Sequence, residues 1–277
     1  MRTIRAAAVP LVLLAALPPA PATAWPAALT ERITRDARRL VPRSLGMLMS
    51  EREKEIFEAA QRLPPELTQA VAADLVRGEL QPATIALWEA QTDEAVRLLR
   101  AQKVSEGVVR LGALLRIPAD LSDPVLSVGP EGYPAGVTQQ YYAYVDANLA
   151  KIPVVIESKP ALKLARKDLP AYWKGVFGRS QSQSAVIRTE LFQRGRVVDH
   201  RTVDYRNPVF GVASLSYSRA VNAVAATWLA VWRDVRGDVT RMVTPTPVKP
   251  RDPRDPWAPL GTLPTATPVP TPEVKHP

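Results

Sequence analysis

The 277-residue sequence contains no cysteine and only two histidines, His200 and His276. Without cysteine there is no disulfide framework, no lipid-modified N-terminal cysteine and no cysteine nucleophile. A Ser-His-Asp site would need His200, because His276 stands in a Pro-rich tail, and no serine lies in a Gly-x-Ser-x-Gly turn. The glycines are scattered, so no phosphate-binding glycine loop is predicted. His200 itself is expected to be an ordinary surface or packing residue.

Long hydrophobic runs are equally scarce, apart from one near the N-terminus. Two arginines precede the apolar run 6–17, and an Ala-x-Ala pattern follows at Ala22 and Ala24. These features predict a secretory signal over residues 1–24. The run is shorter than the roughly 20 residues that a membrane-spanning helix needs, and no later stretch is long and apolar enough. We therefore expect an exported protein, in the periplasm or the medium, that is not an integral membrane protein.

The chain is basic, with 36 Lys and Arg against 27 Asp and Glu. Removal of the signal takes away two arginines, which leaves 34 against 27 and a net charge of about +7. A basic surface attracts anionic lipid, cell-wall polymer or nucleic acid, although a moderate excess is more often only a solvated surface. An anionic lipid or another envelope component is the favoured partner and nucleic acid is not. Nothing indicates an oligomeric state.

Proline is concentrated at the C-terminus, where eleven of the last 34 residues are proline. Such a segment cannot form helices or sheet ladders and is expected to be disordered. We predict a tail over residues 241–277, which could be a spacer, a glycosylated stalk or a dispensable end. The part that folds, 25–240, has the size of one domain. Acidic pairs in turns or in the tail, such as those of "LSDP" and "RDPRDP", are expected to be caps and solvated charges.

The folding part is predicted to be an all-α globular domain of seven or eight helices. Apolar residues at helical spacing, with Pro and Gly at the ends, predict helices at 29–41, 50–63, 65–78, 83–102, 105–117, 137–150 and 214–237. At the start of 50–63, Ser50 and Glu53 suggest a capping box. The segment 185–205 is less regular, with a helix ending near Gly195 and then an extended piece. The helix 214–237 is the clearest, with Ser214 or Ser216 as its cap, Gly237 at its end, and two tryptophans on its buried side.

Several segments resemble the zinc-dependent phospholipase C and single-strand nuclease superfamily. Cleavage after Ala24 would make Trp25 the N-terminus, and "WPAALTERI" (25–33) is similar to the start of mature members. "RIPADLSDPVL" (116–126) and "YAYVD" (142–146) stand where His-x-x-x-Asp…Pro-Leu-His and His-x-x-x-Glu motifs would fall, and 214–237 resembles a late core helix. The resemblance implies a helical exported fold with a metal site.

The departures from the family pattern imply that this metal site has been lost. The histidine positions hold Glu31, Arg116, Leu126 and Tyr142 instead. The remaining candidate metal ligands are Trp25, Asp120 and Asp146, and Asp146 replaces a glutamate. Zinc favours nitrogen ligands, and two histidines outside the matched motifs are too few for a site with several ions. The resemblance therefore implies a vestigial site with no cofactor.

Arg116 then has two possible roles. It could replace the charge of the metal, pairing with Asp120, Asp146 or Glu31, and so form a ligand site with Glu31 and Tyr142. Alternatively, it could end its helix in water as an ordinary i,i+4 partner of Asp120, an interaction of a few tenths of a kcal/mol.

Three functions follow from these residues. The leading hypothesis is a non-catalytic relative of zinc-dependent phospholipase C that binds an anionic lipid or an envelope partner through the former cleft. The first alternative is a phosphoric-ester hydrolase with a reduced zinc site at Trp25, Asp120 and Asp146. The second is an envelope spacer that acts through its Pro-rich tail.

Overall fold

The computed structural model describes residues 25–127, 132–156 and 161–238. The chain divides into two units at residue 243, and every described residue belongs to the first. The described residues form ten α-helices, four short 3-10 helices and one two-stranded hairpin, so the predicted all-α class is confirmed. The helix count is higher than the predicted seven or eight. The predicted signal and the predicted tail both lie outside the described residues.

The helices follow one another with short connections. In chain order they are α1 (Ala27–Arg38), α2 (Arg43–Glu51), α3 (Glu53–Gln61), α4 (Pro65–Arg77), α5 (Pro82–Arg100), α6 (Val104–Ala113), α7 (Arg116–Leu121), α8 (Val137–Asn148), α9 (Leu169–Leu191) and α10 (Pro208–Asp234). The 3-10 helices are η1 (Leu149–Lys151), η2 (Ala161–Lys163), η3 (Arg166–Asp168) and η4 (His200–Thr202). Strands β1 (Phe192–Gln193) and β2 (Arg196–Val197) pair antiparallel. None of the helices formed by the described residues is long and apolar enough to cross a membrane.

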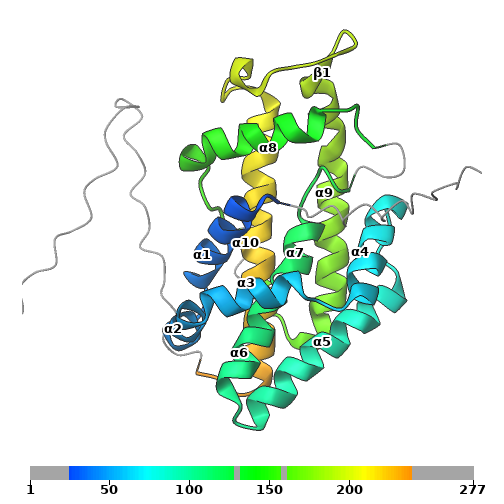
Figure 1. Ribbon diagram of the computed structural model, residues 1–277. Helices are drawn as coiled ribbons and strands as arrows, with labels where there is room; N and C mark the ends of the chain where they lie inside the picture. The colour runs from blue at the N-terminus through cyan, green and yellow to red at the C-terminus, as the bar shows by residue number, and fades with distance from the viewer. Residues whose placement is uncertain (1–24, 128–131, 157–160, 239–277) are drawn as a thin grey trace, which may run out of the picture. The chain divides into compact units, whose positions relative to one another are not determined.

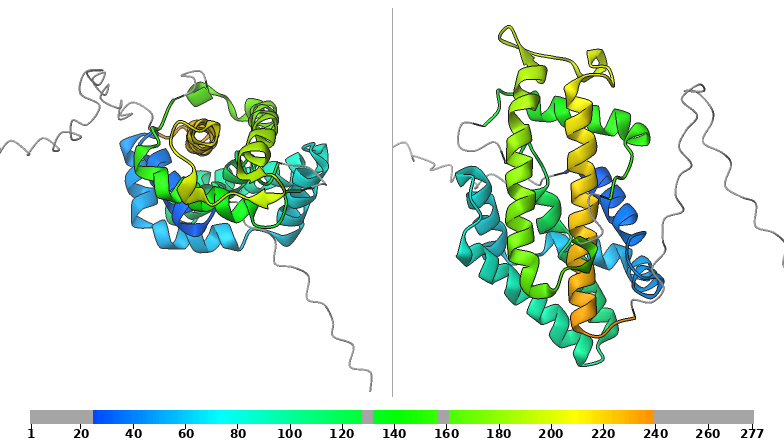
Figure 2. Two further views of the ribbon diagram at one scale, coloured as in Figure 1. Left: turned by 90° about the horizontal axis from the view of Figure 1, so that it is seen from above. Right: turned by 180° about the vertical axis from the view of Figure 1, so that it is seen from behind.

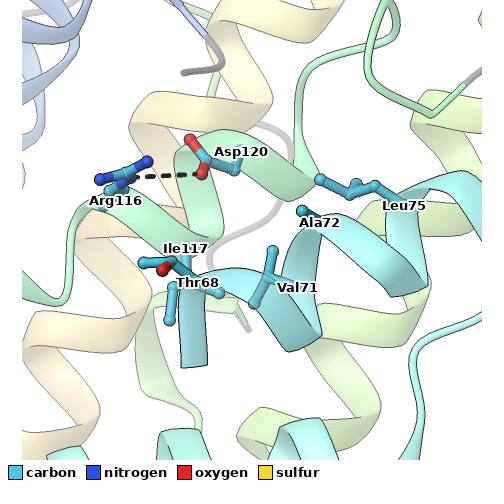
Figure 3. A pocket seen from close by; sticks show the side chains of 7 residues that line it. All are labelled: Thr68, Val71, Ala72, Leu75, Arg116, Ile117 and Asp120. Atoms are coloured by element: carbon cyan, nitrogen blue, oxygen red, sulfur yellow. Dashed lines mark ion pairs between the residues drawn. The ribbon is translucent and has the colours of Figure 1, made fainter. Parts of the chain in front are cut away.

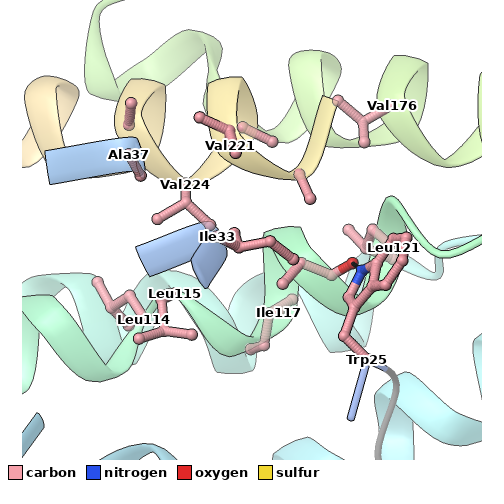
Figure 4. Close-up of a cluster of buried hydrophobic side chains, with 14 of the residues drawn as sticks. Trp25, Ile33, Ala37, Leu114, Leu115, Ile117, Leu121, Val176, Val221 and Val224 are labelled. Atoms are coloured by element: carbon pink, nitrogen blue, oxygen red, sulfur yellow. Dashed lines mark hydrogen bonds between the residues drawn. The ribbon is translucent and has the colours of Figure 1, made fainter. Parts of the chain in front are cut away.

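Helix α10 is the centre of the fold. Nearly every residue from Ser216 to Trp232 is buried, and the helix packs against α9, α1, α7 and η2. Figures 1 and 2 show α9 and α10 side by side through the length of the domain. The short helix α7 lies against α10, and their aliphatic side chains interdigitate with those of α1 (Figure 4). A helix that is apolar on most of its sides is expected at such a core.

The N-terminus of α10 differs from the prediction. The helix begins six residues earlier than expected, at Pro208, and the side chain of Asn207 caps it by accepting a hydrogen bond from the Val209 N–H. Ser216 is fully buried in the core, so it is not the cap. The helix ends at Asp234, and the Gly237 N–H donates to the Trp232 carbonyl just beyond it. The sequence 208–213 is apolar and continues the same helical stripe.

Two predicted helices are each divided in the structure. The expected helix 50–63 is two helices, because α2 ends at Glu51 and α3 begins at Glu53 with no side-chain cap. The predicted Ser50–Glu53 capping box is therefore wrong. The expected helix 105–117 ends at Ala113, and Arg116 begins the new helix α7. Arg116 is thus at the start of a helix and not at the end of one.

In the region 185–205 the predicted helix and the extended piece after it are both present, but the start of the helix was missed. Its helical part belongs to α9, which begins at Leu169 and ends at Leu191. A hairpin follows, and both residues at its turn, Arg194 and Gly195, have positive φ angles of 51° and 74°. The polar run before residue 185 hides the helix from a periodicity test, but packing against α10 stabilises it.

Candidate functional site

Arg116 and Asp120 stand one turn apart on α7, and their side chains pair. The Arg116 Nε lies 3.6 Å from the Asp120 Oδ2, as Figure 3 shows. The two side chains are only 16% and 14% exposed, so this is not the solvated pair of the second interpretation. One further contact of Arg116 is found, a long bond of 3.5 Å from its Nη1 to the Ala60 carbonyl.

These contacts leave the guanidinium poorly satisfied. A guanidinium has five N–H donors. Within the described residues its bond to Ala60, at 3.5 Å, is at the upper limit for a hydrogen bond, and its 3.6 Å contact with Asp120 is an ion pair beyond that limit. Asp120 has no other hydrogen-bond partner among those residues than Arg116. A cation and a carboxylate that are both mostly removed from water are therefore paired at long range only. Such groups retain the capacity to bind a further polar group.

A cavity of about 160 Å³ lies beside this pair. Its walls come from the chain before α1, from α1 itself, from α3 and from the α6–α7 region. It is lined by Trp25, Ala27, Thr30, Glu31, Phe57, Ala60, Gln61, Leu115, Arg116, Ala119 and Asp120. A second, much smaller hollow of about 20 Å³ lies on the α4 side of the same pair (Figure 3). Arg116 and Asp120 line both spaces.

Trp25 is a wall of the cavity and a core residue at once. Its side chain is 2% exposed, and its indole Nε1 donates a 3.0 Å hydrogen bond to the Ala119 carbonyl on α7. Its carbonyl oxygen accepts a 3.1 Å bond from the Thr30 hydroxyl. Figure 4 shows the ring among the buried side chains of this region. The interaction of Trp25 with α7 is therefore structural.

Tyr142 does not line the cavity. Its hydroxyl donates a 2.6 Å hydrogen bond to the Oδ2 of Asp123, while the Val125 N–H donates to the Oδ1 at 3.0 Å. The Tyr142 ring lies 6.2 Å from that of Trp25, centre to centre. The predicted role of Tyr142 in a ligand site beside Arg116 and Glu31 has no support from these contacts.

Asp123 is the residue that sequence reasoning placed wrongly. It belongs to "LSDP" and does cap a turn, but its side chain is fully buried and is not solvated. The only available signal was its position three residues after Asp120. That spacing brings the two carboxyls close enough for Asp123 to raise the pKa of Asp120.

Burial dominates the electrostatics of both acids. It raises the pKa of Asp120 to about 7; the Arg116 guanidinium opposes this effect and the Asp123 carboxyl adds to it. Burial also raises the pKa of Asp123 to about 7, against the hydrogen bonds from Tyr142 and Val125. Near neutral pH each carboxyl therefore exchanges a proton readily. A protonated Asp120 no longer neutralises Arg116.

The two remaining acidic residues predicted for the site, Glu31 and Asp146, lie in different places. Glu31 is exposed and lines the cavity, so the structure brings it together with Arg116, Asp120 and Trp25. Asp146 is exposed on α8 and does not line the cavity. Within the described residues there is no group of three or more His, Cys, Asp or Glu that could hold a metal ion. Of the set Trp25, Asp120 and Asp146, the cavity brings together the first two and leaves Asp146 outside.

His200 lies apart from this region. It is partly buried, and its Nδ1 and backbone N–H both contact the Gln140 Oε1, at 2.9 and 2.8 Å. These contacts join η4 to α8 and are those of a packing residue.

Comparison with known proteins gives no independent assignment. No family model, no curated protein and no solved structure matches this chain.

Proposed function

We propose that the protein is a non-catalytic, exported relative of the zinc-dependent phospholipases C that binds an anionic group in the cavity beside Arg116. The group would belong to an envelope lipid or to another envelope component. The observation that carries the proposal is the Arg116 guanidinium, which is 16% exposed, makes only two long contacts with the described residues and lines a cavity. Guanidinium groups bind phosphate and carboxylate through paired N–H donors.

The size of the cavity limits the ligand. A space of about 160 Å³ is comparable to cavities of roughly 150 Å³ that accept a benzene-sized molecule. It suits a phosphate or carboxylate with a few carbon atoms, and not the acyl chains of a lipid. Trp25 and Phe57 supply apolar walls for those carbons. The bound part of a lipid would be its headgroup.

The charged side chains of the cavity make anion binding depend on pH. Glu31 and Asp120 line it together with Arg116, and two ionised carboxylates oppose an incoming anion. Protonation of Asp120, whose pKa is about 7, removes one of them and frees the guanidinium. Anion binding is therefore expected to be tighter at pH 6 than at pH 8.

Calorimetric titration with glycerol phosphate, at pH 6 and pH 8, tests the proposal. Arg116→Met keeps the length of the aliphatic stem and removes the charge, and we expect at least about a tenfold loss of affinity. Arg110→Met is the matched control, because Arg110 lies on α6, bonds to Gln91 and does not line the cavity. Equal affinities for the Arg116 variant and the native protein would refute the proposal.

Metal content separates this proposal from the hydrolase. Mass spectrometry of the native protein, purified without chelator, is expected to find no stoichiometric zinc even after dialysis against zinc. One bound zinc per chain would overturn the non-catalytic assignment, and hydrolysis of a phosphodiester substrate would then be the next assay.

A further inference from the structure

A basic stripe runs along α1 and into α2. Arg35, Arg39 and Arg43 follow one another at intervals of four residues, and all three are exposed. Arg39 pairs with Asp36 but is still 69% exposed. Arg35 and Arg43 form no ion pair or side-chain hydrogen bond with any described residue. Figures 1 and 2 show α1 and α2 together at one edge of the domain.

Acids neutralise this stripe only in part. Residues 32–48 contain five arginines and a single acid, Asp36, although exposed Glu31 and Glu51 stand at the two ends and Arg38 pairs with Glu53. Asp36 is 4% exposed and points into the core, where it accepts a 2.8 Å hydrogen bond from the Tyr217 hydroxyl. Some exposed arginines elsewhere are paired with exposed or half-exposed acids, as in Arg52–Glu55 and Arg97–Glu94. On α1–α2 the charges of Arg35 and Arg43 are not paired with any described acid.

An exposed apolar side chain extends the stripe by one turn. Met47, four residues after Arg43 on α2, is 53% exposed, and it is among the most exposed large apolar residues described. Cations beside an exposed flexible apolar group suit the interface of an anionic bilayer, where the cations meet headgroups and the apolar group enters the boundary region. Residues 26–56 contain no aromatic residue on which a nucleic-acid base could stack. This composition favours lipid over nucleic acid.

We infer that the α1–α2 surface docks the protein onto an anionic bilayer through Arg35, Arg39, Arg43 and Met47. This inference does not depend on the ligand of the cavity. Docking by so few cations is reversible and weak, and it is screened by salt. It would hold the protein at the membrane without a membrane-spanning segment.

Vesicle co-sedimentation of the full chain tests the inference. One probe is vesicles of phosphatidylcholine alone. The other is vesicles that also contain ~30% phosphatidylglycerol, which makes their surface negative. We expect binding to the anionic vesicles only, with loss in high salt. Arg35→Ala/Arg43→Ala should lower the partition coefficient by about 25-fold, since each arginine near an anionic surface contributes about fivefold. Met47→Ser should give a smaller loss that salt does not change.

The hairpin supplies a control with the same change in net charge. Arg194 and Arg196 are both exposed and lie on β1–β2, away from α1 and α2 (Figure 1). Arg194→Ala/Arg196→Ala should leave vesicle binding within about twofold of the native value, because neither residue touches the docked surface. Circular dichroism confirms that each variant is folded.

Three results would overturn the inference. They are no binding to the anionic vesicles, an equal loss in the hairpin control, and tighter binding to a DNA oligonucleotide than to the vesicles at the same salt. Arg116→Met is expected to bind vesicles normally, so failure of the cavity proposal and failure of this one are distinguishable.

Discussion

The buried carboxyl of Asp123 gives the protein an unusual pH dependence, which Asp123→Asn should reduce. A protonated aspartic acid and an asparagine are both neutral, and each keeps one oxygen that accepts from the Val125 N–H. Each also turns a donor toward the Tyr142 hydroxyl, which then accepts where it donated to the ionised carboxylate. The substitution therefore fixes the side chain in the form that the folded state prefers. The volume of the side chain hardly changes, and the bond from the Val125 N–H is kept.

The direction of the effect follows from proton binding. The pKa of Asp123 is about 7 in the folded protein and about 3.9 in an unfolded chain. Between these values the folded state binds more protons than the unfolded state, so the free energy of unfolding falls as the pH rises. The stabilisation is complete below about pH 4 and is lost above about pH 7. Three pH units correspond to about 4 kcal/mol, as an order of magnitude.

Asp120 adds to this dependence in the same direction, because its pKa is also raised to about 7. Its contribution is smaller than that of Asp123, since its side chain is 14% exposed while that of Asp123 is fully buried. Asp123→Asn removes one of the two contributions. It also weakens the other, because the Asp123 charge raises the pKa of Asp120.

Urea unfolding, followed by tryptophan fluorescence at pH 5, 6, 7 and 8, measures the effect. Native stability should fall by several kcal/mol from pH 5 to pH 8. The Asp123→Asn variant should match the native protein at pH 5 within about 1 kcal/mol, exceed it at pH 8, and show less than half of the decline. A native stability that rises over this range would refute the reasoning. So would a variant that is less stable than the native protein at pH 8.

Three further changes test the packing by the same urea assay at fixed pH. Gly112→Ala should destabilise the protein by about 1–3 kcal/mol, because the added Cβ would lie 2.6 Å from Ile56. Gly211→Ala is the matched control, because its added Cβ would have nothing within 4 Å. The control should stabilise the protein by about 0.5–1 kcal/mol. If the two alanine variants changed stability equally, the close α3–α6 packing would be refuted. Tyr217→Phe should cost about 1.5–3 kcal/mol, since it removes a donor to the buried Asp36 carboxylate, and no loss would show that Asp36 is satisfied without it.

The fold class could be predicted because most helices have local signals. Helix α4 is the clearest case: Pro65 begins it, and Gly78 follows its end with a φ of 82°, a conformation that favours glycine. The apolar stripe of α10 and the burial of Trp228 were visible in the same way. In these segments local propensity and tertiary packing agree.

Other boundaries depend on packing that is distant in sequence. Nothing local separates α2 from α3 at Arg52, and the run 104–121 remains apolar across the break between α6 and α7. That break turns α7 so that Trp25 can donate to Ala119, a contact across 94 residues. The spacing of apolar residues along the sequence cannot predict such a contact.

The candidate site was predictable only in part for the same reason. The i,i+4 spacing of Arg116 and Asp120 predicts their contact, and the structure confirms it. Their burial comes from α1 and α3, which supply the cavity walls at Glu31 and Phe57. The hydrogen bond between Tyr142 and Asp123 likewise joins α8 to the turn after α7. Each of these requires the tertiary fold.

The Arg116–Asp120 pair makes the metal and anion interpretations mutually exclusive in this conformation. A divalent ion bound by Asp120 would lie near the guanidinium, and at about 4 Å the repulsion is roughly 8 kcal/mol at an effective dielectric of 20. A metal must also displace the proton that burial favours on Asp120. An anion faces neither obstacle, because it meets the cation directly and gains from the protonated form of Asp120. The same guanidinium repels a metal ion and attracts an anion. Replacing Arg116 therefore removes the attraction for anions, whereas a zinc site would still lack its remaining ligands.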